Sequence, residues 1–296
     1  LINLIVPRGT SHMKTQKSYL KLKDYSVSGD SFELIYDASK EMLFTHPKPP
    51  ESELSNYYSN TDYISHTNQQ KSLFDLLYHA VRYVSVRRKL RLLKPFQSQQ
   101  ATLLDVGAGT GFFLRAAKKR GWTVTGVEPN SSARNLANIK APNTVFDSET
   151  LRTLPEKSFD VITLWHVLEH LPNLEDDIRI FQKLLKPNGR IVVAVPNFKS
   201  FDAEYFKGFW AAYDVPRHLW HFSQQSISKI FSEVQIKLES THPLVMDAYY
   251  VCLLSNKLKT GAHRILNSFW VGLVSNIKAL KSGEYSSLIY ILKNKN

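Results

Sequence analysis

A run of alternating glycines after a short apolar segment constrains this 296-residue chain more than any other feature. Residues 103–111 read LLDVGAGTG, and a helix-compatible segment, FFLRAA, follows at once. Such a pattern is typical of a buried parallel strand that turns sharply into a helix and bares its backbone to a ligand. Glu128 ends the next strand-like run, at 123–127, so we expect a carboxylate at the same sheet edge.

The spacing of the glycines argues against two other nucleotide-binding turns. The dinucleotide fingerprint G-x-G-x-x-G would need a glycine at position 112, where this chain has Phe112. A phosphate-binding loop would need G-x-x-x-x-G-K-[ST], which the sequence does not contain. A turn without either motif can still bare its backbone to a ligand. The alternative is a tight turn followed by an unrelated surface glutamate.

The pattern D-x-G-x-G-x-G, which starts at Asp105, resembles motif I of the class I S-adenosylmethionine-dependent methyltransferases. The resemblance implies S-adenosylmethionine as cofactor and S-adenosylhomocysteine as product. The cofactor-binding residues that it implies around this turn are Asp105, Gly107, Ala108, Gly109, Gly111, Glu128 and Pro129. We expect Glu128 to accept hydrogen bonds from both ribose hydroxyls, and Asp105 to favour the positively charged end of the cofactor.

Two further motifs resemble the same family. Residues 158–172, SFDVITLWHVLEHLP, are similar to the fourth-strand motif of the subgroup that includes the ubiquinone-biosynthesis O-methyltransferases. Residues 185–193, LKPNGRIVV, are similar to the family's turn into the fifth strand. Trp165 and His166 fall at the carboxyl end of the fourth strand, where ligands bind in open α/β sheets, so we expect them at the methionine part of the cofactor.

The adenine contact is expected from the loop after the third strand, as the resemblance implies. Asp147 is the first choice there, and Ser148 and Glu149 are close behind it. Each of them could equally be an ordinary loop residue.

Residues 213–223, YDVPRHLWHFS, supply charged and imidazole side chains where the acceptor is expected. They resemble a motif of a bacterial subfamily associated with cell-envelope or quinone-like chemistry. A hydroxyl acceptor needs a base, so His218 or His166 is the expected base, since imidazole titrates near neutral pH. Arg217 could bind an acceptor carboxylate or phosphate. The alternative is that Arg217 pairs with Asp214 and that the histidines are structural.

Strand-like and helix-like segments alternate from residue 102, which predicts an α/β fold. Strands are predicted at 102–106, 123–128, 144–146, 159–165, 190–196, 235–242 and 287–293. Helices are predicted at 110–120, 131–138, 174–186 and after the capping residue Ser223. The resemblance implies a Rossmann-like seven-stranded sheet with helices on both faces and an antiparallel last strand.

The chain divides into five expected segments. These are an apparent expression scar (1–13), an N-terminal extension or lid (14–98), the cofactor-binding core (99–243), a helical insertion (244–286) and the closing strand of the core (287–296). Many relatives in the bacterial subfamily carry a zinc ribbon near the N-terminus, but this extension has no cysteine and is expected to be metal-free. Tyr58, Tyr63 and His66 could fold over the cofactor.

The net charge of +12 favours an anionic partner such as nucleic acid, a phosphorylated intermediate or a membrane surface. Part of this charge lies at 82–94, where Leu90 and Leu93 on the inner side of a helix would leave the basic residues on a solvated face. The apolar-rich insertion could cover the acceptor site, pack on the sheet or touch lipid.

A single cysteine, Cys252, argues for a reducing, cytoplasmic location and against a Cys-rich zinc site, and we predict no metal ligands.

These features predict a methyltransferase that acts on an oxygen of a small molecule, such as a quinone-like, sugar or envelope-precursor hydroxyl. One alternative is an RNA methyltransferase, which the charge favours, although the sequence lacks an Asn-Pro-Pro-Tyr or Asp-Pro-Pro-Tyr tetrapeptide. Another is a protein that binds the cofactor without turnover. The acceptor and the oligomeric state are left open by these residues.

Overall fold

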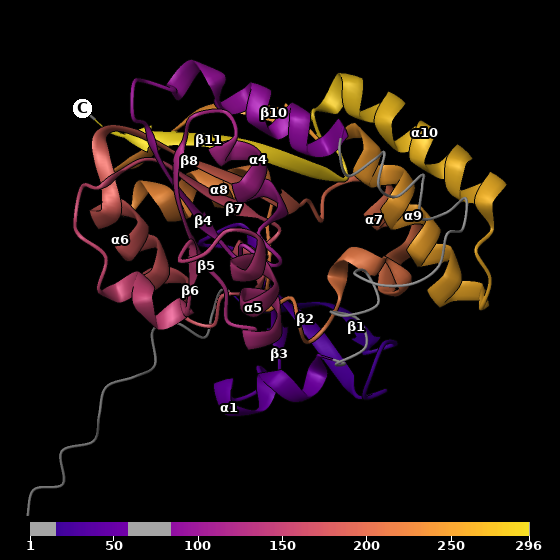
Figure 1. Ribbon diagram of the computed structural model, residues 1–296. Helices are drawn as coiled ribbons and strands as arrows, with labels where there is room; N and C mark the ends of the chain where they lie inside the picture. The colour runs from indigo at the N-terminus through magenta and orange to yellow at the C-terminus, as the bar shows by residue number, and fades with distance from the viewer. Residues whose placement is uncertain (1–15, 59–83, 296) are drawn as a thin grey trace, which may run out of the picture.

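A seven-stranded sheet forms the core of the computed structural model, which describes residues 16–58 and 84–295 (Figure 1). The strand order is β10-β11-β8-β7-β4-β5-β6. The strands are β4 (Thr102–Val106), β5 (Thr123–Val127), β6 (Val145–Phe146), β7 (Phe159–Trp165), β8 (Leu185–Pro196), β10 (Ile236–Pro243) and β11 (Ser287–Asn294). β11 runs antiparallel to both of its neighbours, β8 and β10. The predicted α/β fold with an antiparallel last strand is confirmed.

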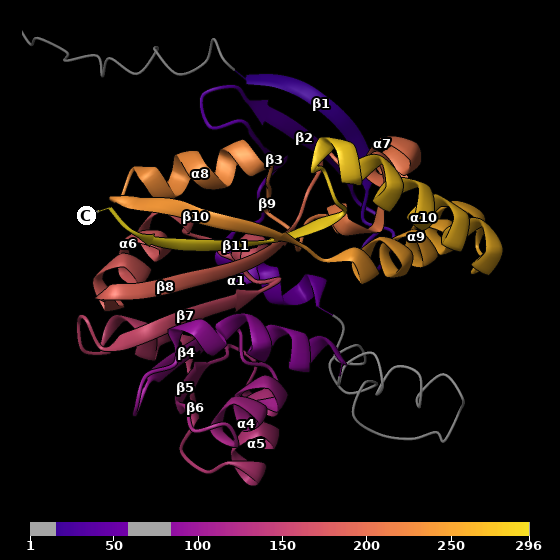
Figure 2. The same ribbon diagram turned by 90° about the horizontal axis from the view of Figure 1, so that it is seen from above.

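Helices cover both faces of this sheet (Figure 2). The main helices of the core are α4 (Phe112–Lys118), α5 (Ser131–Lys140), α6 (Leu174–Leu184) and α8 (Gln224–Ser232). Because side chains alternate along a strand, Leu104 of β4 joins the core under α6 and α8, whereas Leu103 joins the core under α4 and residues 84–93. Ser223 caps α8 as predicted, in a reciprocal hydrogen-bonded box with Ser226.

Residues 84–93 are helical and lie on the α4 face of the sheet. Val86, Leu90 and Leu93 are buried, whereas Arg88 and Arg91 are exposed. The interpretation of this basic segment as a helix with a solvated charged face is therefore confirmed for its described residues.

The N-terminal segment forms a second, smaller sheet that the sequence predicts only in part. Its order is β1 (Gln16–Lys23), β2 (Ser31–Asp37), β3 (Met42–His46) and β9 (Trp220–His221). The sequence indicates a strand in this segment only at 32–36, where the run FELIY lies within β2. β9 comes from the core and pairs antiparallel with β3, so the small sheet combines the N-terminal segment with one strand of the core. Tyr63 and His66, two of the predicted lid residues, lie outside the described residues.

The insertion before the last strand, in which the sequence indicates an apolar-rich helix at 265–277, is a hairpin of two helices, α9 (Val245–Thr260) and α10 (Ile265–Ser282). It packs with α7 (Phe201–Phe206) beside the large sheet, and α10 lies at the rim of the molecule (Figures 1 and 2). Among the described helices, none combines the length and apolar composition that crossing a bilayer requires.

The remaining elements are short. They are α1 (Glu51–Leu54) and 3₁₀ turns at Ser55–Tyr57, Lys94–Phe96, Ser148–Arg152, Leu168–His170, Lys207–Phe209 and Ala211–Tyr213.

Candidate functional site

The turn between β4 and α4 has a backbone that only glycine adopts readily. Gly107, Gly109 and Gly111 have φ values of +71°, +53° and +68°, all in the left-handed region. A Cβ atom on Gly107 would lie 2.4 Å from Cγ2 of Val167, which follows β7. At Gly109, in contrast, no atom of the described residues lies within 4 Å of that position. The turn thus leaves open space against bare backbone, which fits a cofactor pressed onto it.

Glu128 points its carboxylate at this turn from the end of β5. Its side chain is 2% exposed. Oε2 accepts a hydrogen bond from the Gly109 N–H at 2.8 Å, and Oε1 accepts one from the Asn130 N–H at 3.0 Å. Each carboxylate oxygen can accept more than one hydrogen bond, so the two amides orient the group and leave it able to bind a diol.

Arg134 connects Glu128 to the loop where the adenine contact is expected. Its Nη1 donates to the main-chain oxygens of Glu128 and Pro129 at 2.7 and 2.6 Å, and lies 2.9 Å from Oδ2 of Asp147. Asp147 also caps the 3₁₀ turn that begins at Ser148. The structure therefore brings Asp147 and Glu128 together at the carboxyl ends of β5 and β6. We did not predict Arg134, although its place in the helix directly after Glu128 was a usable signal.

Asp105 lies beneath the turn rather than in the open space beside it. Its carboxylate is buried between β4 and β7, where the Thr163 hydroxyl donates to Oδ1 at 2.6 Å. Burial raises the pKa of Asp105 to about 7. The side chain thus holds two strands together directly under the predicted cofactor site.

Trp165 ends β7 with its indole partly buried. Lys89 Nζ lies 4.3 Å from the centre of a Trp165 ring, and the Phe113 ring packs edge-on at 5.5 Å. The buried indole N–H finds no hydrogen-bond acceptor among the described residues. A buried donor without a partner is costly, so a bound ligand that accepts from it would be stabilised.

His166 has a left-handed backbone, with φ 57°, and lies between two carboxylates. Its Nδ1 is 3.5 Å from Oε1 of Glu169, and its Nε2 is 3.2 Å from Oδ2 of Asp247. Burial opposes the charge, but the neighbouring carboxylates of Asp247 and Glu169 raise the pKa of His166 to about 9. The ring therefore carries protons on both nitrogens at neutral pH. Asp247 comes from the insertion and was not predicted as a site residue.

Two more imidazoles surround the buried Glu169, which is 1% exposed. His170 Nδ1 lies 3.0 Å from the Arg217 carbonyl oxygen and also 3.1 Å from the Tyr58 hydroxyl. His218 Nδ1 lies 2.8 Å from the Ala212 carbonyl oxygen. A carbonyl oxygen only accepts, so each Nδ1 carries the proton and each neutral ring keeps its lone pair on Nε2. Burial, together with the neighbouring His218, lowers the pKa of His170 to about 4.

These three side chains also have the composition of a metal site. Within the described chain, Glu169, His170 and His218 each offer one ligand atom, and these atoms lie within 4.8 Å of one another. A carboxylate with two imidazoles whose Nδ1 protons are fixed by carbonyls suits a divalent cation. We predicted no metal ligands, because a neighbouring pair and a residue much later in the chain form no ligand motif in the sequence.

Arg217 is engaged in a buried ion-pair network. Its Nε lies 3.0 Å from both carboxylate oxygens of Asp214, its Nη1 donates to the Tyr57 carbonyl oxygen, and its Nη2 lies 3.0 Å from Oδ1 of Asp24. Burial disfavours the Asp24 carboxylate, but Arg217 and backbone N–H groups lower its pKa to about 2. Of the two alternatives for Arg217, the structure thus shows the pair with Asp214. The second ion pair, with Asp24, ties the turn after β1 to the loop that precedes β9.

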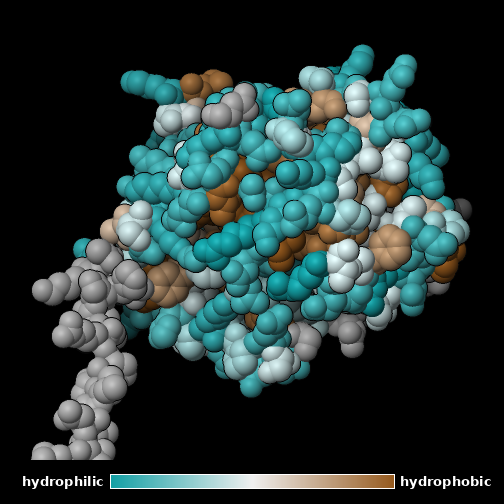
Figure 3. All heavy atoms as spheres, turned by 90° about the vertical axis from the view of Figure 1, so that its left-hand side faces the viewer, coloured by the Kyte–Doolittle hydropathy of each residue, from teal (hydrophilic) through white to brown (hydrophobic). Residues whose placement is uncertain are grey.

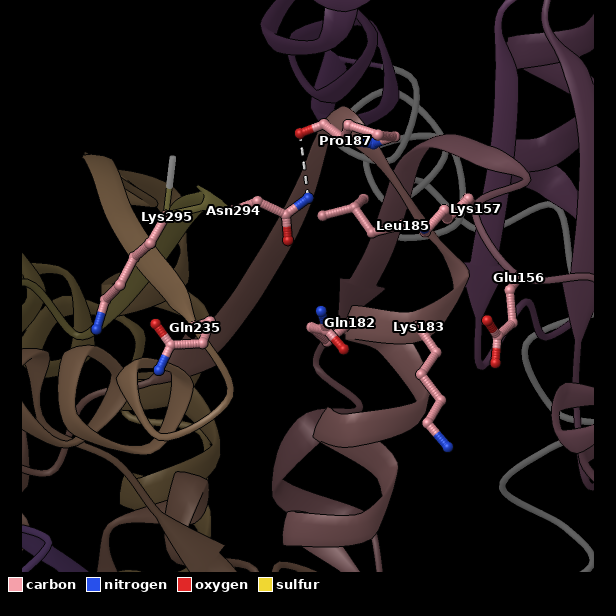
Figure 4. A pocket seen from close by; sticks show the side chains of 9 residues that line it. All are labelled: Glu156, Lys157, Gln182, Lys183, Leu185, Pro187, Gln235, Asn294 and Lys295. Atoms are coloured by element: carbon pink, nitrogen blue, oxygen red, sulfur yellow. Dashed lines mark hydrogen bonds between the residues drawn. The ribbon is translucent and has the colours of Figure 1, made fainter.

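A separate pocket of about 420 Å³ lies near the opposite ends of the parallel strands (Figure 4). Glu156 and Lys157 precede β7, and Asn294 ends β11, where it donates to the Pro187 carbonyl oxygen. The remaining lining residues are Gln182, Lys183, Leu185, Gln235 and Lys295. None of the predicted site residues lines this pocket.

The seven-stranded topology, the glycine turn and the oriented Glu128 together define a class I S-adenosylmethionine-dependent methyltransferase. A family model described as a methyltransferase domain matches residues 78–241, more than half of the chain, and the chain belongs to this family.

Relatives and solved structures agree with this assignment. The ubiquinone biosynthesis O-methyltransferase of Coxiella burnetii is 32% identical over 131 residues, which cover 38% of this chain and 56% of the relative. The chain spans about half the length of the curated relatives it matches. The magnesium protoporphyrin IX methyltransferase of Synechocystis PCC 6803, solved with bound S-adenosylhomocysteine, has a TM-score of 0.55 at 14% identity and covers 83% of this chain and 100% of its own.

The same fold also occurs in the [4+2]-cyclase SpnF, with a TM-score of 0.52 at 14% identity, covering 78% of this chain and 86% of that protein. Likeness at this level of identity shows the fold, and the chemistry is argued from the site.

Proposed function

We propose that this protein transfers the methyl group of S-adenosylmethionine to a hydroxyl oxygen of a small-molecule acceptor. The observation that carries the proposal is His218, whose Nδ1 is fixed by the Ala212 carbonyl oxygen at 2.8 Å. Nε2 is thereby the basic nitrogen of the neutral ring, beside the buried carboxylate of Glu169. A base so oriented is what deprotonation of a hydroxyl needs.

The residues around the glycine turn fit the cofactor. Glu128 would hold the ribose, Asp147 lies at the edge where the adenine is expected, and the open side of Gly109 would receive the amino-acid part. The indole N–H of Trp165, which has no acceptor within 16–58 and 84–295, offers a further donor. When bound, S-adenosylmethionine supplies a methyl group on a positively charged sulfur, so the protein's task is to align the acceptor and remove its proton.

His218 takes the acceptor proton on Nε2, while its Nδ1–H continues to donate to the Ala212 carbonyl oxygen. Glu169 offsets the positive charge that then forms on the ring. His166 already carries its proton and is held between Glu169 and Asp247, so we assign it the role of a positioning residue and His218 that of the base.

A quinone-like phenol is the acceptor class that we favour among phenolic, sugar and envelope-precursor hydroxyls. The relatives named ubiquinone biosynthesis O-methyltransferases support it. An RNA acceptor is less well supported, because the basic residues at 88 and 91 lie on the outer face of a helix that is packed on the sheet.

The test combines binding and turnover. Calorimetric titration of S-adenosylhomocysteine should show micromolar binding, and incubation with S-adenosylmethionine and a panel of catechols, sugars and short RNAs should methylate a catechol oxygen. Absence of cofactor binding would overturn the whole proposal. Binding with transfer only to RNA would replace the acceptor class, and binding without transfer to any of the panel would favour a non-catalytic cofactor-binding protein.

A further inference from the structure

Helix α10 exposes its large apolar side chains and buries small or polar ones, the reverse of the usual arrangement in a water-soluble domain. Its buried residues are mostly small or polar: Ser268, Val271, Gly272, Ser275, Asn276 and Ala279. Its large apolar side chains point outward, with exposures between 37% and 79%: Ile265, Leu266, Phe269, Trp270, Val274, Ile277 and Leu280. We call these seven residues the outer face of α10.

The inner face of α10 is well packed against its neighbours. The exposed apolar residues are therefore not explained by a helix that packs with the wrong face inward. A Cβ on Gly272 would lie 2.8 Å from the Tyr249 ring, which shows how closely α10 approaches α9. Asn256 Nδ2 donates to Ser268 Oγ at 2.8 Å, and Ser275 Oγ donates to Asp202 at 2.7 Å. Small residues and polar pairs between helices, with apolar side chains outside, are typical of helices that meet lipid.

The charges of the hairpin are nearly all of one sign. Its basic residues are Lys257, Lys259, Arg264, Lys278 and Lys281, and all five are exposed. Its acidic residue, Asp247, faces His166 in the site. An apolar face with cationic neighbours is complementary to a bilayer surface that carries anionic headgroups.

This concentration of exposed apolar residues on one helix differs from the rest of the described surface. The α6 side of the molecule is largely hydrophilic, with smaller apolar areas between polar side chains (Figure 3). Exposed apolar residues elsewhere, such as Ile139 on α5, are more scattered along the chain. A contiguous patch of this kind marks an interaction site.

We propose that the outer face of α10 binds the surface of an anionic lipid bilayer, with its aromatic and aliphatic side chains among the headgroups and Lys257, Arg264 and Lys281 at the phosphates. The other two lysines, Lys259 and Lys278, lie over the rings of Tyr205 and Phe201 on α7. The helix lies in the plane of the surface, since none of the described helices can span a bilayer. Asp247 on α9 reaches the site, so the element that meets the membrane also contacts the catalytic cluster.

The first test measures co-sedimentation with vesicles of phosphatidylcholine alone or mixed with phosphatidylglycerol. Wild type should sediment with the mixed vesicles, at least about tenfold less with the neutral ones, and less at high salt. The emission of Trp270, which is 60% exposed, should shift to the blue, and Trp270→Phe should lose most of that shift while still sedimenting. The double variant Leu266→Glu/Ile277→Glu should lose binding, whereas the matched control Ile139→Glu should keep it.

Several results would overturn the proposal. These are a failure of wild type to sediment with anionic vesicles, equal binding to neutral vesicles, or retained binding by the Leu266→Glu/Ile277→Glu variant. A dimer in analytical ultracentrifugation without lipid, dissociated by that variant and not binding vesicles, would assign the face to a second copy of the chain. All positions changed are exposed, and circular dichroism checks that each variant is folded. Vesicle binding is measured without cofactor, so its outcome is independent of the proposed methyl transfer.

Discussion

His166 Nε2 lies 3.2 Å from Asp247 Oδ2 and joins the end of β7 to the first turn of α9. The other nitrogen of the ring faces Glu169. This imidazole therefore connects the insertion to the buried carboxylate beneath the proposed base.

The charge on His166 should make part of the stability of the protein depend on pH. Because Asp247 and Glu169 raise its pKa to about 9, the stabilisation is complete below the ordinary histidine pKa and is lost as the pH rises through about 9. His166→Asn keeps a residue that tolerates the left-handed backbone and removes the charge. Its thermal midpoint should fall furthest below wild type at about pH 6 and approach it near pH 10. An equal deficit at every pH would contradict the ion-pair argument, and exposed His263→Asn is the control.

Glu128→Gln should weaken S-adenosylhomocysteine binding by at least about tenfold, or about 1.4 kcal/mol. The amide nitrogen of glutamine cannot accept the hydrogen bond that Oε1 or Oε2 accepts in wild type. Calorimetric titration measures the change, with the exposed Glu156→Gln near the opposite ends of the strands as the control. Unchanged affinity in Glu128→Gln would remove this residue from the cofactor site.

Gly107→Ala should destabilise the fold more than Gly109→Ala. Both substitutions place alanine at a left-handed φ, at a cost of about 1 kcal/mol or more, but only the first forces a Cβ to within 2.4 Å of Val167. Denaturant unfolding of the two variants gives the comparison. Adding Val167→Ala should recover stability for Gly107→Ala and not for Gly109→Ala, and equal behaviour of the two double variants would refute the steric explanation.

His218→Gln should lower kcat by about 10²–10⁴ and leave cofactor affinity unchanged, because the residue acts on the acceptor proton. A chelator should leave wild-type turnover intact if His218 is a base. Loss of turnover on chelation, restored by a divalent cation, would instead make His218 a metal ligand together with Glu169 and His170.

Arg217→Met should destabilise the protein by about 3–5 kcal/mol, because it leaves the buried Asp24 without its cation. The additional change Asp24→Asn should recover part of this loss. With the pKa of Asp24 lowered to about 2, the wild-type stabilisation is present above its ordinary pKa and disappears as the pH falls through about 2. A raised KM with unchanged unfolding free energy would show that Arg217 binds the acceptor instead.

Local patterns predicted most of the large sheet. β4 and β7 are apolar runs of strand length, and the glycines after β4 set the turn that follows. β9 was missed because two residues carry no periodic pattern, and because its partner β3 lies far earlier in the sequence. α9 was missed because apolar side chains occur on most of its circumference, so no face stands out.

The site was predictable where spacing alone defines it. Glu128 follows from its position after a strand, and the structure places it at the turn. Asp247 and Arg134 were missed, because their contacts depend on how distant elements pack. The direction in which the Asp105 side chain points could not be predicted either. A glycine turn does not show whether the preceding carboxylate faces a ligand or Thr163.

The pairing of β3 with β9 gives the order of synthesis a structural meaning. β1, β2 and β3 leave the ribosome before the strands of the large sheet, but the strand that completes their sheet is translated after β8. Until then, the edge of β3 is open to other strands, and the Asp24 carboxylate lacks its ion pair with Arg217. The small sheet is therefore begun before the large sheet and completed only after β8, and a chain that stops before residue 221 leaves the edge of β3 exposed.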